Sequence, residues 1–344
     1  MTERIRPPTG VLDAYDLDPA STEILAGGLI NLSFGVVRRD GSRCVLQRLS
    51  PIFGPEVDED LDAVTQHLLG KGLATPRLIR TAAGDPHVDV DGRIWRLLTR
   101  IEGETRETVG ADAEAAEAGR VLGEFHRALA DFDAPLSSTR PRVHDLGRHV
   151  AALGRALDAH EPHAARREVG TLAATIFELA AKLGPLPEAP ERIVHGDPKI
   201  SNVVFSRGRG VCLVDLDTIA RMPVAFELGD ALRSWCNRAG EDSPDAAISI
   251  GAFRRALEGY RAGASGLLGP DEWRAIPNAT LAIAIELAAR FAADALNESY
   301  FAWDRRRFAS ASAHNLARAA SQLRLAEDVA RRLPVLEAAV VTLV

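Results

Sequence analysis

Polar side chains suited to phosphoryl transfer occur together in one short stretch of the chain, residues 193–217, where each group follows an apolar run. They are His195, Asp197, Lys199 and Asn202 in a first turn, and Asp215 and Asp217 in a second. An acid at the end of a buried strand is costly unless it is paired or binds a cation. Phosphoryl transfer requires a carboxylate that orients the attacking hydroxyl, oxygen ligands for a divalent cation, and positive charge beside the phosphates. The stretch therefore contains each residue type that this chemistry needs.

The spacing of these residues matches the pattern that protein kinases use, in which an Asn follows the catalytic Asp by five positions and a metal-binding Asp ends the next hairpin. Asn202 lies five residues after Asp197, and residues 203–205 and 211–214 can pair as a hairpin that returns Asp215 to Asn202. We therefore predict Asp197 as the base or orienter of the acceptor hydroxyl. Asn202 and Asp215 are the predicted ligands of Mg²⁺, which favours oxygen donors.

Two residues of the first turn have less specific predicted roles. His195 is expected to brace the backbone of the loop, because a lone histidine is more often structural than catalytic. Lys199 is two residues after Asp197 and can either reach the transferred phosphoryl group or pair with a surface acid. We favour the first reading and count Lys199 with the catalytic residues.

The elements that must hold these turns change in character along the chain. Residues 22–50 are typical of strands, with a hairpin at Asp40-Gly41, and a helix with an acidic first turn follows from Glu56. Strands recur near 87–90 and 94–98, and from Glu114 onward most of the sequence has helical periodicity. We predict an α+β fold with a small antiparallel-sheet lobe at 1–102, a hinge near 98–103, and a larger helical lobe at 103–344 that holds the catalytic loop and the acceptor site.

The amino-acid composition limits the classes of binding partner and the cell compartment that we expect for this protein. The 41 basic and 48 acidic residues give a net charge of −7, and only 5% of residues are aromatic, which argues against nucleic-acid binding. The three cysteines are far apart and indicate reduced thiols, neither a disulfide framework nor a zinc site. The N-terminus has no apolar core, and no apolar helix is long enough to span a bilayer. We expect a cytoplasmic monomer or homodimer with no membrane partner.

The loop His195–Asn202 resembles the catalytic loop of aminoglycoside phosphotransferases and choline kinases. Residues 213–218 and 226–233, with 45–48, 64–68, 290–291 and 300–301, are similar to the N-acetylhexosamine 1-kinase branch of that family. The resemblance implies a protein-kinase-like bilobal fold, the cofactors ATP and Mg²⁺, and a small-molecule acceptor, with a sugar as the leading candidate. An aminoglycoside, a choline-like alcohol or homoserine is the alternative acceptor. A nucleotide-binding pseudokinase and a metal-dependent hydrolase are alternatives of other classes.

The resemblance also implies roles for residues outside the loop. Asp217 would support the metal or touch substrate, and Asp230 would brace the catalytic loop from a helix. Further positions follow in the same way: Gly27 and Gly28 over the phosphates, Gln47 at the nucleotide, Thr99 and Ile101 at the hinge beside adenine, and Arg290 and Tyr300 at the acceptor.

Three positions depart from the pattern. Leu29 stands where the hexosamine branch has a histidine, and Gln47 stands where protein kinases have the phosphate-binding lysine. Gln47 is the best support for a pseudokinase, although Arg48 could supply the charge if strand alternation allowed it. The helix acid that would pair with that lysine is left open between Glu59 and Asp62.

Overall fold

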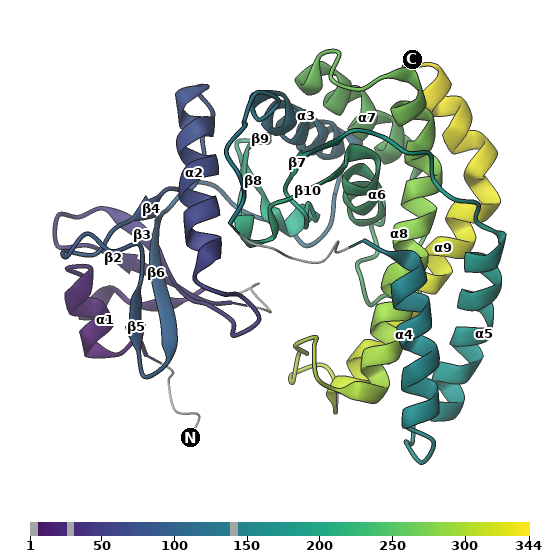
Figure 1. Cartoon of the computed structure of the whole chain (residues 1–344), viewed down its shortest axis with the longest axis horizontal. Coiled ribbons are helices and arrows are strands. Elements are labelled where there is room, and N and C mark those ends of the chain that lie inside the picture. Colours follow the sequence, from purple (N-terminus) through teal and green to yellow (C-terminus); the bar gives the residue numbers. More distant parts are fainter. Residues whose placement is uncertain (1–5, 26–30, 138–143) are drawn as a thin grey trace. The chain divides into compact units, whose positions relative to one another are not determined.

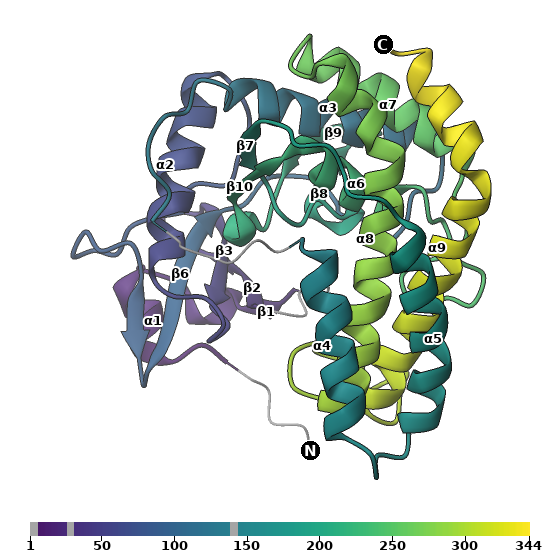
Figure 2. The ribbon, with the colours of Figure 1, turned by 45° about the vertical axis from the view of Figure 1, so that its right-hand side comes forward.

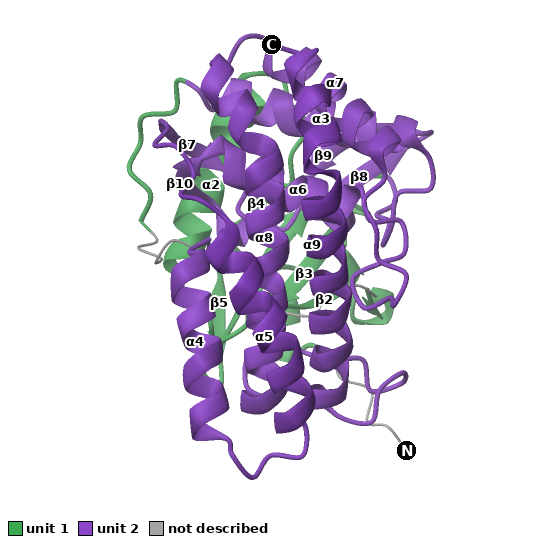
Figure 3. Cartoon of the chain, turned by 90° about the vertical axis from the view of Figure 1, so that its right-hand side faces the viewer, with its two compact units in different colours: residues 1–102, 131–139 green, residues 103–130, 140–344 purple. Residues whose placement is uncertain are grey.

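The computed structural model describes residues 6–25, 31–137 and 144–344. The chain forms two compact units, residues 1–102 with 131–139 and residues 103–130 with 140–344 (Figures 1 and 3). The first contains a six-stranded sheet, and the second is mostly helical. The fold class predicted from the sequence is confirmed.

The sheet of the first unit is antiparallel, and the order β1-β2-β3-β6-β4 places β6 between β3 and β4, with β5 also pairing with β6. Its strands are β1 Glu23–Ile24, β2 Leu32–Val37, β3 Arg43–Arg48, β4 Leu78–Ile79, β5 Val88–Val90 and β6 Arg93–Thr99. The predicted hairpin at Asp40-Gly41 joins β2 to β3, and Gly41 has a φ of +87°, which an L side chain rarely adopts.

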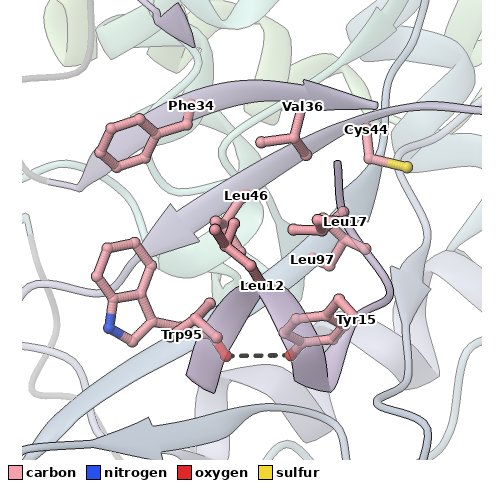
Figure 4. Close-up of a cluster of buried hydrophobic side chains, with 10 residues drawn as sticks. Leu12, Tyr15, Leu17, Phe34, Val36, Cys44, Leu46, Trp95 and Leu97 are labelled. Atoms are coloured by element: carbon pink, nitrogen blue, oxygen red, sulfur yellow. Dashed lines mark hydrogen bonds between the residues drawn. The ribbon is translucent and has the colours of Figure 1, made fainter. Parts of the chain in front are cut away.

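Helix α1, Thr9–Ala14, covers one face of this sheet. Alternate residues of β2, β3 and β6 point toward it and form a buried apolar cluster with Leu12 and Tyr15 (Figure 4). The sheet residues of this cluster are Phe34, Val36, Cys44, Leu46, Trp95 and Leu97. The Tyr15 hydroxyl donates a hydrogen bond of 3.1 Å to the carbonyl of Trp95. The residues that alternate with these along the strands, including Gln47 and Arg96, therefore lie on the other face.

Helix α2, Glu56–Gly70, is the helix predicted from the 3.6-residue periodicity. Its first turn is acidic, which suits the positive end of the helix dipole. The apolar positions Val57, Leu61, Val64 and Leu68 are buried, as their spacing predicts.

The second unit consists of α3 Asp112–Ala128, α4 Leu146–Ala159, α5 Arg166–Lys182, α6 Val224–Trp235, α7 Ile250–Ala264, α8 Pro270–Asn297 and α9 Ala311–Val341. Helix α8 packs against α4, α5, α6 and α9 (Figure 2). Helices α3 and α7 approach closely because glycines face the partner backbone. A Cβ on Gly119 would lie 2.0 Å from the carbonyl oxygen of Ala256.

Two short antiparallel strand pairs lie within the helical unit. Strand β7, Glu191–Val194, pairs with β10, Ala220–Pro223, and β8, Val203–Ser206, pairs with β9, Arg209–Leu213. The β8–β9 hairpin is the one predicted between the two polar turns. Among the described residues, no helix is long and apolar enough to cross a membrane.

Candidate active site

The first polar turn follows β7 and brings its three predicted chemical residues together. Lys199 Nζ donates to Asp197 Oδ2 at 2.5 Å, and Asn202 Nδ2 donates to the Asp197 carbonyl at 2.8 Å and to Oδ2 at 3.3 Å. The Lys199 ammonium thus pairs with the predicted catalytic acid itself, and not with a separate surface acid. The amide nitrogen of Asn202 is occupied by Asp197, which leaves its Oδ1 as the atom that could bind a cation.

The second polar turn returns to the first through the β8–β9 hairpin. Val214 N donates to the Asn202 carbonyl at 2.9 Å, so Asp215 begins next to Asn202, as the hairpin predicted. Asp215 has φ 64° and ψ 56°, a left-handed conformation that is uncommon outside glycine and often marks a functional turn. Its side chain does not cap the short helix that follows, Leu216–Thr218.

The charges of this group favour a bound cation. Burial and the negative charge of Asp217 raise the pKa of Asp215 above its usual value, while the charge of Lys199 opposes the rise. Asp217 is itself buried, with 3% of its surface exposed. Two carboxylates that interact through their charges and one amide oxygen would be a hard donor set of the kind that Mg²⁺ binds, because Mg²⁺ takes its remaining ligands from water or phosphate. No group of three or more His, Cys, Asp or Glu side chains in the described ranges forms a denser metal site.

The environment of the Asp197–Lys199 pair favours the charged form of both groups, because the pKa of the carboxyl is lowered and that of the ammonium is raised. Burial alone would raise the pKa of Asp197, but the charge of Lys199 and its hydrogen bond hold that pKa below the usual value. Burial alone would lower the pKa of Lys199, but the charges of Asp197 and Asp215 raise it above the usual value. A carboxylate of low pKa is a weak proton acceptor, so Asp197 is better suited to orient a hydroxyl than to deprotonate it early.

His195 connects the two turns. Its Nε2 lies 2.9 Å from the Val214 carbonyl, and the N–H of Asp197 donates to Nδ1 at 3.3 Å. Because Nδ1 accepts, Nε2 carries the proton and donates to Val214. The imidazole therefore holds the backbone of the loop against the end of the β8–β9 hairpin.

Glu227, on α6, is a residue of this site that sequence reasoning missed. Its two carboxylate oxygens accept the backbone N–H groups of His195 at 2.8 Å and Gly196 at 3.0 Å, and its side chain is completely buried. Gly196 has a φ of +83°, and a Cβ there would lie 2.1 Å from the Thr218 carbonyl oxygen. Burial alone would raise the pKa of Glu227, but the contact with His126 and its charge lower it.

The same face of α6 holds the rest of the loop. The Ser234 hydroxyl accepts from Ile200 N at 3.0 Å, and Trp235 Nε1 donates to the Pro198 carbonyl at 2.8 Å. Positions 227, 234 and 235 share a helical face because seven residues are close to two full turns. Glu227 and Ser234 are polar residues seven positions apart in the helix that follows the second polar turn. This spacing is the signal that could have identified Glu227.

The bracing role predicted for Asp230 stays a prediction, because in the described part of the chain its hydrogen bonds go to Arg233 and not to the loop. Its Oδ1 accepts from Arg233 Nε at 3.0 Å and Nη2 at 2.8 Å, while Glu227 makes the contacts to the loop. A shift of three residues turns a helical side chain by about 60°, enough to direct Asp230 to its helix neighbour Arg233.

In the first unit, the acid that faces the sheet is neither Glu59 nor Asp62. Glu59 is exposed, and Asp62 pairs with Arg77 at 3.4 Å and Arg80 at 2.8 Å. Asp58 is completely buried instead, and its Oδ1 accepts from Arg96 Nη1 at 3.0 Å.

The other residues predicted on the nucleotide side belong to strands of the first unit and to the segment that follows them, and their roles stay predictions. Gln47 Oε1 accepts from Arg96 Nε at 3.0 Å and from Nη2 at 2.7 Å. Arg48 lies over the Trp95 ring at 6.0 Å, on the α1 face, so it does not replace a lysine at position 47. Thr99 ends β6, where its hydroxyl accepts from Arg77 N at 2.8 Å, and Ile101 is half-buried beyond it. Gly27, Gly28 and Leu29 lie outside the described residues.

The two predicted acceptor residues are neighbours. The Arg290 guanidinium lies over the ring of Tyr300, 5.9 Å from its centroid, and Tyr300 is 55% exposed. The loop that carries Tyr300 is fixed by Asp294, whose carboxylate accepts the backbone N–H groups of residues 299, 300 and 301 at 3.0, 3.0 and 2.8 Å. One turn before Arg290, the buried Glu286 accepts from His144 Nδ1 at 3.1 Å.

Known proteins share both the sequence pattern and the fold. The model of the phosphotransferase enzyme family matches residues 21–276. The homoserine kinase of Methylobacterium radiotolerans is 29% identical over 172 residues, 50% of this chain and 51% of that protein. The homoserine kinase of Phenylobacterium zucineum is 26% identical over 260 residues, 73% and 74% of the two chains. Like the protein from Methylobacterium radiotolerans, other homoserine kinases that match this chain do so over only about half of their own length.

Solved structures agree on the fold. An aminoglycoside phosphotransferase from Alicyclobacillus acidocaldarius has a TM-score of 0.63 at 18% identity, with 98% of each chain covered. A microcompartment-associated aminopropanol kinase has a TM-score of 0.63 at 16% identity, covering 95% of this chain and 97% of that one. At these identities the likeness shows a shared protein-kinase-like fold. With three quarters of its length matched by the family model, the chain belongs to the phosphotransferase enzyme family, as its catalytic-loop motif predicted.

Proposed function

We propose that this protein is an ATP- and Mg²⁺-dependent kinase that moves the γ-phosphate to a hydroxyl of a small molecule. The observation that supports this most directly is the contact of Asp197 with both Lys199 and Asn202, with Asp215 beginning at the same point. These groups are an orienting carboxylate, a cation and oxygen ligands, the set that phosphoryl transfer requires.

Each residue has a distinct part in this proposal. Asp197 accepts a hydrogen bond from the acceptor hydroxyl and aligns its oxygen with the γ-phosphorus, while Lys199 keeps Asp197 ionised and faces the transferred group. Asn202 Oδ1 and Asp215 would hold Mg²⁺, with Asp217 in support. When bound, the metal would neutralise charge on the phosphates.

The nucleotide would bind through residues of the first unit. Gln47 and the Gly27-Gly28 turn would contact the phosphates, and the backbone at Thr99 and Ile101 would meet the adenine base. The segment 98–103 is then a hinge between the nucleotide-binding lobe, 1–102, and the lobe that carries the acceptor site, 103–344.

Two acceptors are the leading candidates. Sequence features of the N-acetylhexosamine 1-kinase branch favour a free sugar, with Arg290 and Tyr300 against it. The curated relatives named above favour homoserine.

The test is release of ADP from Mg-ATP with homoserine, free sugars, hexosamines, aminoglycosides and amino alcohols as acceptors. Turnover with one class, lost in Asp197→Asn, would support the kinase and identify the acceptor. Binding of ATP without turnover on the whole panel would instead favour the pseudokinase. Phosphate released from ATP equally in the presence and absence of every acceptor would favour a hydrolase.

A further inference from the structure

The face of the sheet opposite α1 carries a row of polar residues at matched positions on three strands. Ser33 on β2 is paired in register with Gln47 on β3, and Gln47 is paired with Arg96 on β6. Directly paired residues of neighbouring strands point to the same side. The cluster of Figure 4 takes the alternate residues, so this row lies on the opposite face.

Hydrogen bonds run continuously along the row and into α2. Gln47 Nε2 donates to Ser33 Oγ at 3.2 Å, and Gln47 Oε1 receives two N–H groups of Arg96. Arg96 then donates to Asp58, whose second oxygen lies 2.9 Å from His87 Nδ1. The guanidinium and the Asp58 carboxylate are both completely buried, which requires that their charges be paired.

This network has the charge balance of the lysine–glutamate pair of protein kinases but a different construction. In the kinase template a lysine of the third strand contacts the phosphates and is held by an acid of the following helix. Here the third strand supplies the neutral Gln47, the helix supplies Asp58, and the positive charge enters from β6 as Arg96. The cation and the acid are both still present on this face of the sheet.

Arg96 also decides which way the Gln47 amide points. Two N–H groups of the guanidinium occupy the carbonyl oxygen of Gln47, so the amide cannot turn that oxygen outward without breaking both bonds. Its NH₂ group therefore points away from Arg96. One of the two hydrogens goes to Ser33, and none of the described residues supplies an acceptor for the other.

We propose that Gln47 binds a phosphate oxygen of the nucleotide through this remaining N–H, and that Arg96 is the positioning residue that orients and polarises the amide for it. The inference rests on the proposed function, since it assumes a nucleotide phosphate at this face. Arg96 acts through Gln47 and does not itself touch the nucleotide. The Asp58 carboxylate in turn holds Arg96.

Gln47→Glu is the most direct variant. A glutamate of the same shape still accepts from Arg96, and the Ser33 hydroxyl can donate to it in place of accepting. The outward N–H is lost, and a negative charge is added on the face where the phosphates would lie. Gln47→Met removes the N–H without adding charge and separates these two effects. The matched control is Gln66→Glu, because Gln66 is an exposed residue of the same unit whose Oε1 accepts from Arg77 at 2.6 Å.

The measurement is calorimetric affinity for Mg-AMP-PNP and for adenosine, which lacks phosphates. We expect Gln47→Met to weaken Mg-AMP-PNP binding about tenfold to a hundredfold, the effect of one hydrogen bond to a charged group. Gln47→Glu should weaken it further, because its carboxylate repels the phosphates. Adenosine binding should not change, and Gln66→Glu should bind both ligands as the wild type does. Unchanged Mg-AMP-PNP binding in Gln47→Met, or equal weakening of both ligands in that variant, would overturn the inference.

A second pair of variants tests Arg96. Arg96→Met combined with Asp58→Asn removes both buried charges, so that neither remains unpaired. This double variant should also weaken Mg-AMP-PNP binding and leave adenosine binding unchanged. A second double variant, Arg96→Met with Gln47→Lys and an intact Asp58, should restore much of the Mg-AMP-PNP affinity, because it places a lysine opposite Asp58. If the first double variant does not fold, Gln47→Met decides whether the amide N–H binds a phosphate. If the wild type does not bind Mg-AMP-PNP, the proposed function is wrong. If the wild type binds Mg-AMP-PNP and Gln47→Met binds it equally well, only this inference is rejected.

Discussion

Replacing Glu227 with glutamine tests whether α6 holds the catalytic loop in its active geometry. The two oxygens of Glu227 accept the backbone N–H groups of His195 and Gly196 in a fully buried position. A glutamine has one carbonyl oxygen, so its NH₂ group would face the second backbone N–H and leave that group without an acceptor. Hydrogen bonds to a charged group contribute about 1.5–3 kcal/mol each, so we expect Glu227→Gln to lower the free energy of unfolding by about 2–4 kcal/mol.

The loss should appear in both stability and turnover. For a unit of this size, 1 kcal/mol corresponds to about 2–4 °C, so the melting temperature should fall by about 5–15 °C. Asp197 follows Gly196 directly, and a misplacement of about 1 Å can reduce turnover about a hundredfold. The assays are thermal unfolding and acceptor-dependent ADP release, the latter at a temperature where the variant is fully folded.

Asp328→Asn is the control for a purely structural effect. Asp328 is also a buried acid that accepts a backbone N–H, from Ile248 at 2.9 Å, and it pairs with Arg331 and Arg332. We expect it to lower the melting temperature and leave kcat unchanged. A Glu227→Gln protein that melts lower but turns over at the wild-type rate would refute the positioning argument. One that keeps the wild-type melting temperature would refute the bracing contact itself.

Four further outcomes follow from the site. Asp197→Asn should reduce kcat on the order of a thousandfold while the protein still binds Mg-AMP-PNP, as measured by calorimetry and ADP release. Asp215→Asn should raise the Mg²⁺ concentration needed for half-maximal activity, and an unchanged Mg²⁺ titration would contradict its role as a ligand. Arg290→Gln should raise the KM for the acceptor about tenfold with a smaller effect on kcat, and Arg290→Lys should recover part of the loss. Burial opposes protonation of His144, but its bond to Glu286 raises its pKa, so the folded state binds the proton more tightly than the unfolded state does. Stability from this pair should be present below about pH 6.5 and decline as pH rises through the higher folded pKa, and His144→Asn should flatten that part of the unfolding profile.

The catalytic loop could be predicted because its information is local. Asp197 and Asn202 are five residues apart, and the hairpin that returns Asp215 needs only two short apolar runs and a turn. Backbone sterics and strand pairing then restrict where these side chains can lie. The helix at Glu56 and the β2–β3 hairpin were predictable for the same reason, since each has its own periodicity or turn signal.

The bracing acid could not be identified from its neighbourhood alone. Glu227 and Asp230 are both acidic, lie on the same helix and become buried. They differ by about 60° in direction around the helix axis, and the orientation of α6 relative to the loop comes from tertiary packing. The polar Ser234, seven residues after Glu227, was the available sign that this was the face in contact with the loop.

The acid of α2 that faces the sheet could not be identified from the sequence for a related reason. The sequence leaves Glu59 and Asp62 open, and the first turn contains the acids Glu56, Asp58 and Glu59, which suit the helix dipole equally well. The position of each acid relative to the buried apolar face of the helix distinguishes Asp58 from Glu59. Asp58 follows the buried Val57 and its side chain is directed toward the sheet, while Glu59 is exposed to solvent. Its partner Arg96 is 38 residues away, a pairing that depends on the register of β6 against β3.

Arg96 also changes how Gln47 should be interpreted. Taken alone, a glutamine in place of the strand lysine is the strongest argument for a pseudokinase, because the cation that faces the phosphates is missing. The relevant physical quantity, however, is the charge on that face of the sheet and not the residue type at one position. The register of β3 with β6 places a guanidinium against Gln47, and Asp58 pairs with that guanidinium as a helix acid would pair with lysine. Asp197, Asn202 and Asp215 are also present, and the network retains a positive charge in Arg96, so a glutamine at position 47 is not by itself an argument against catalysis.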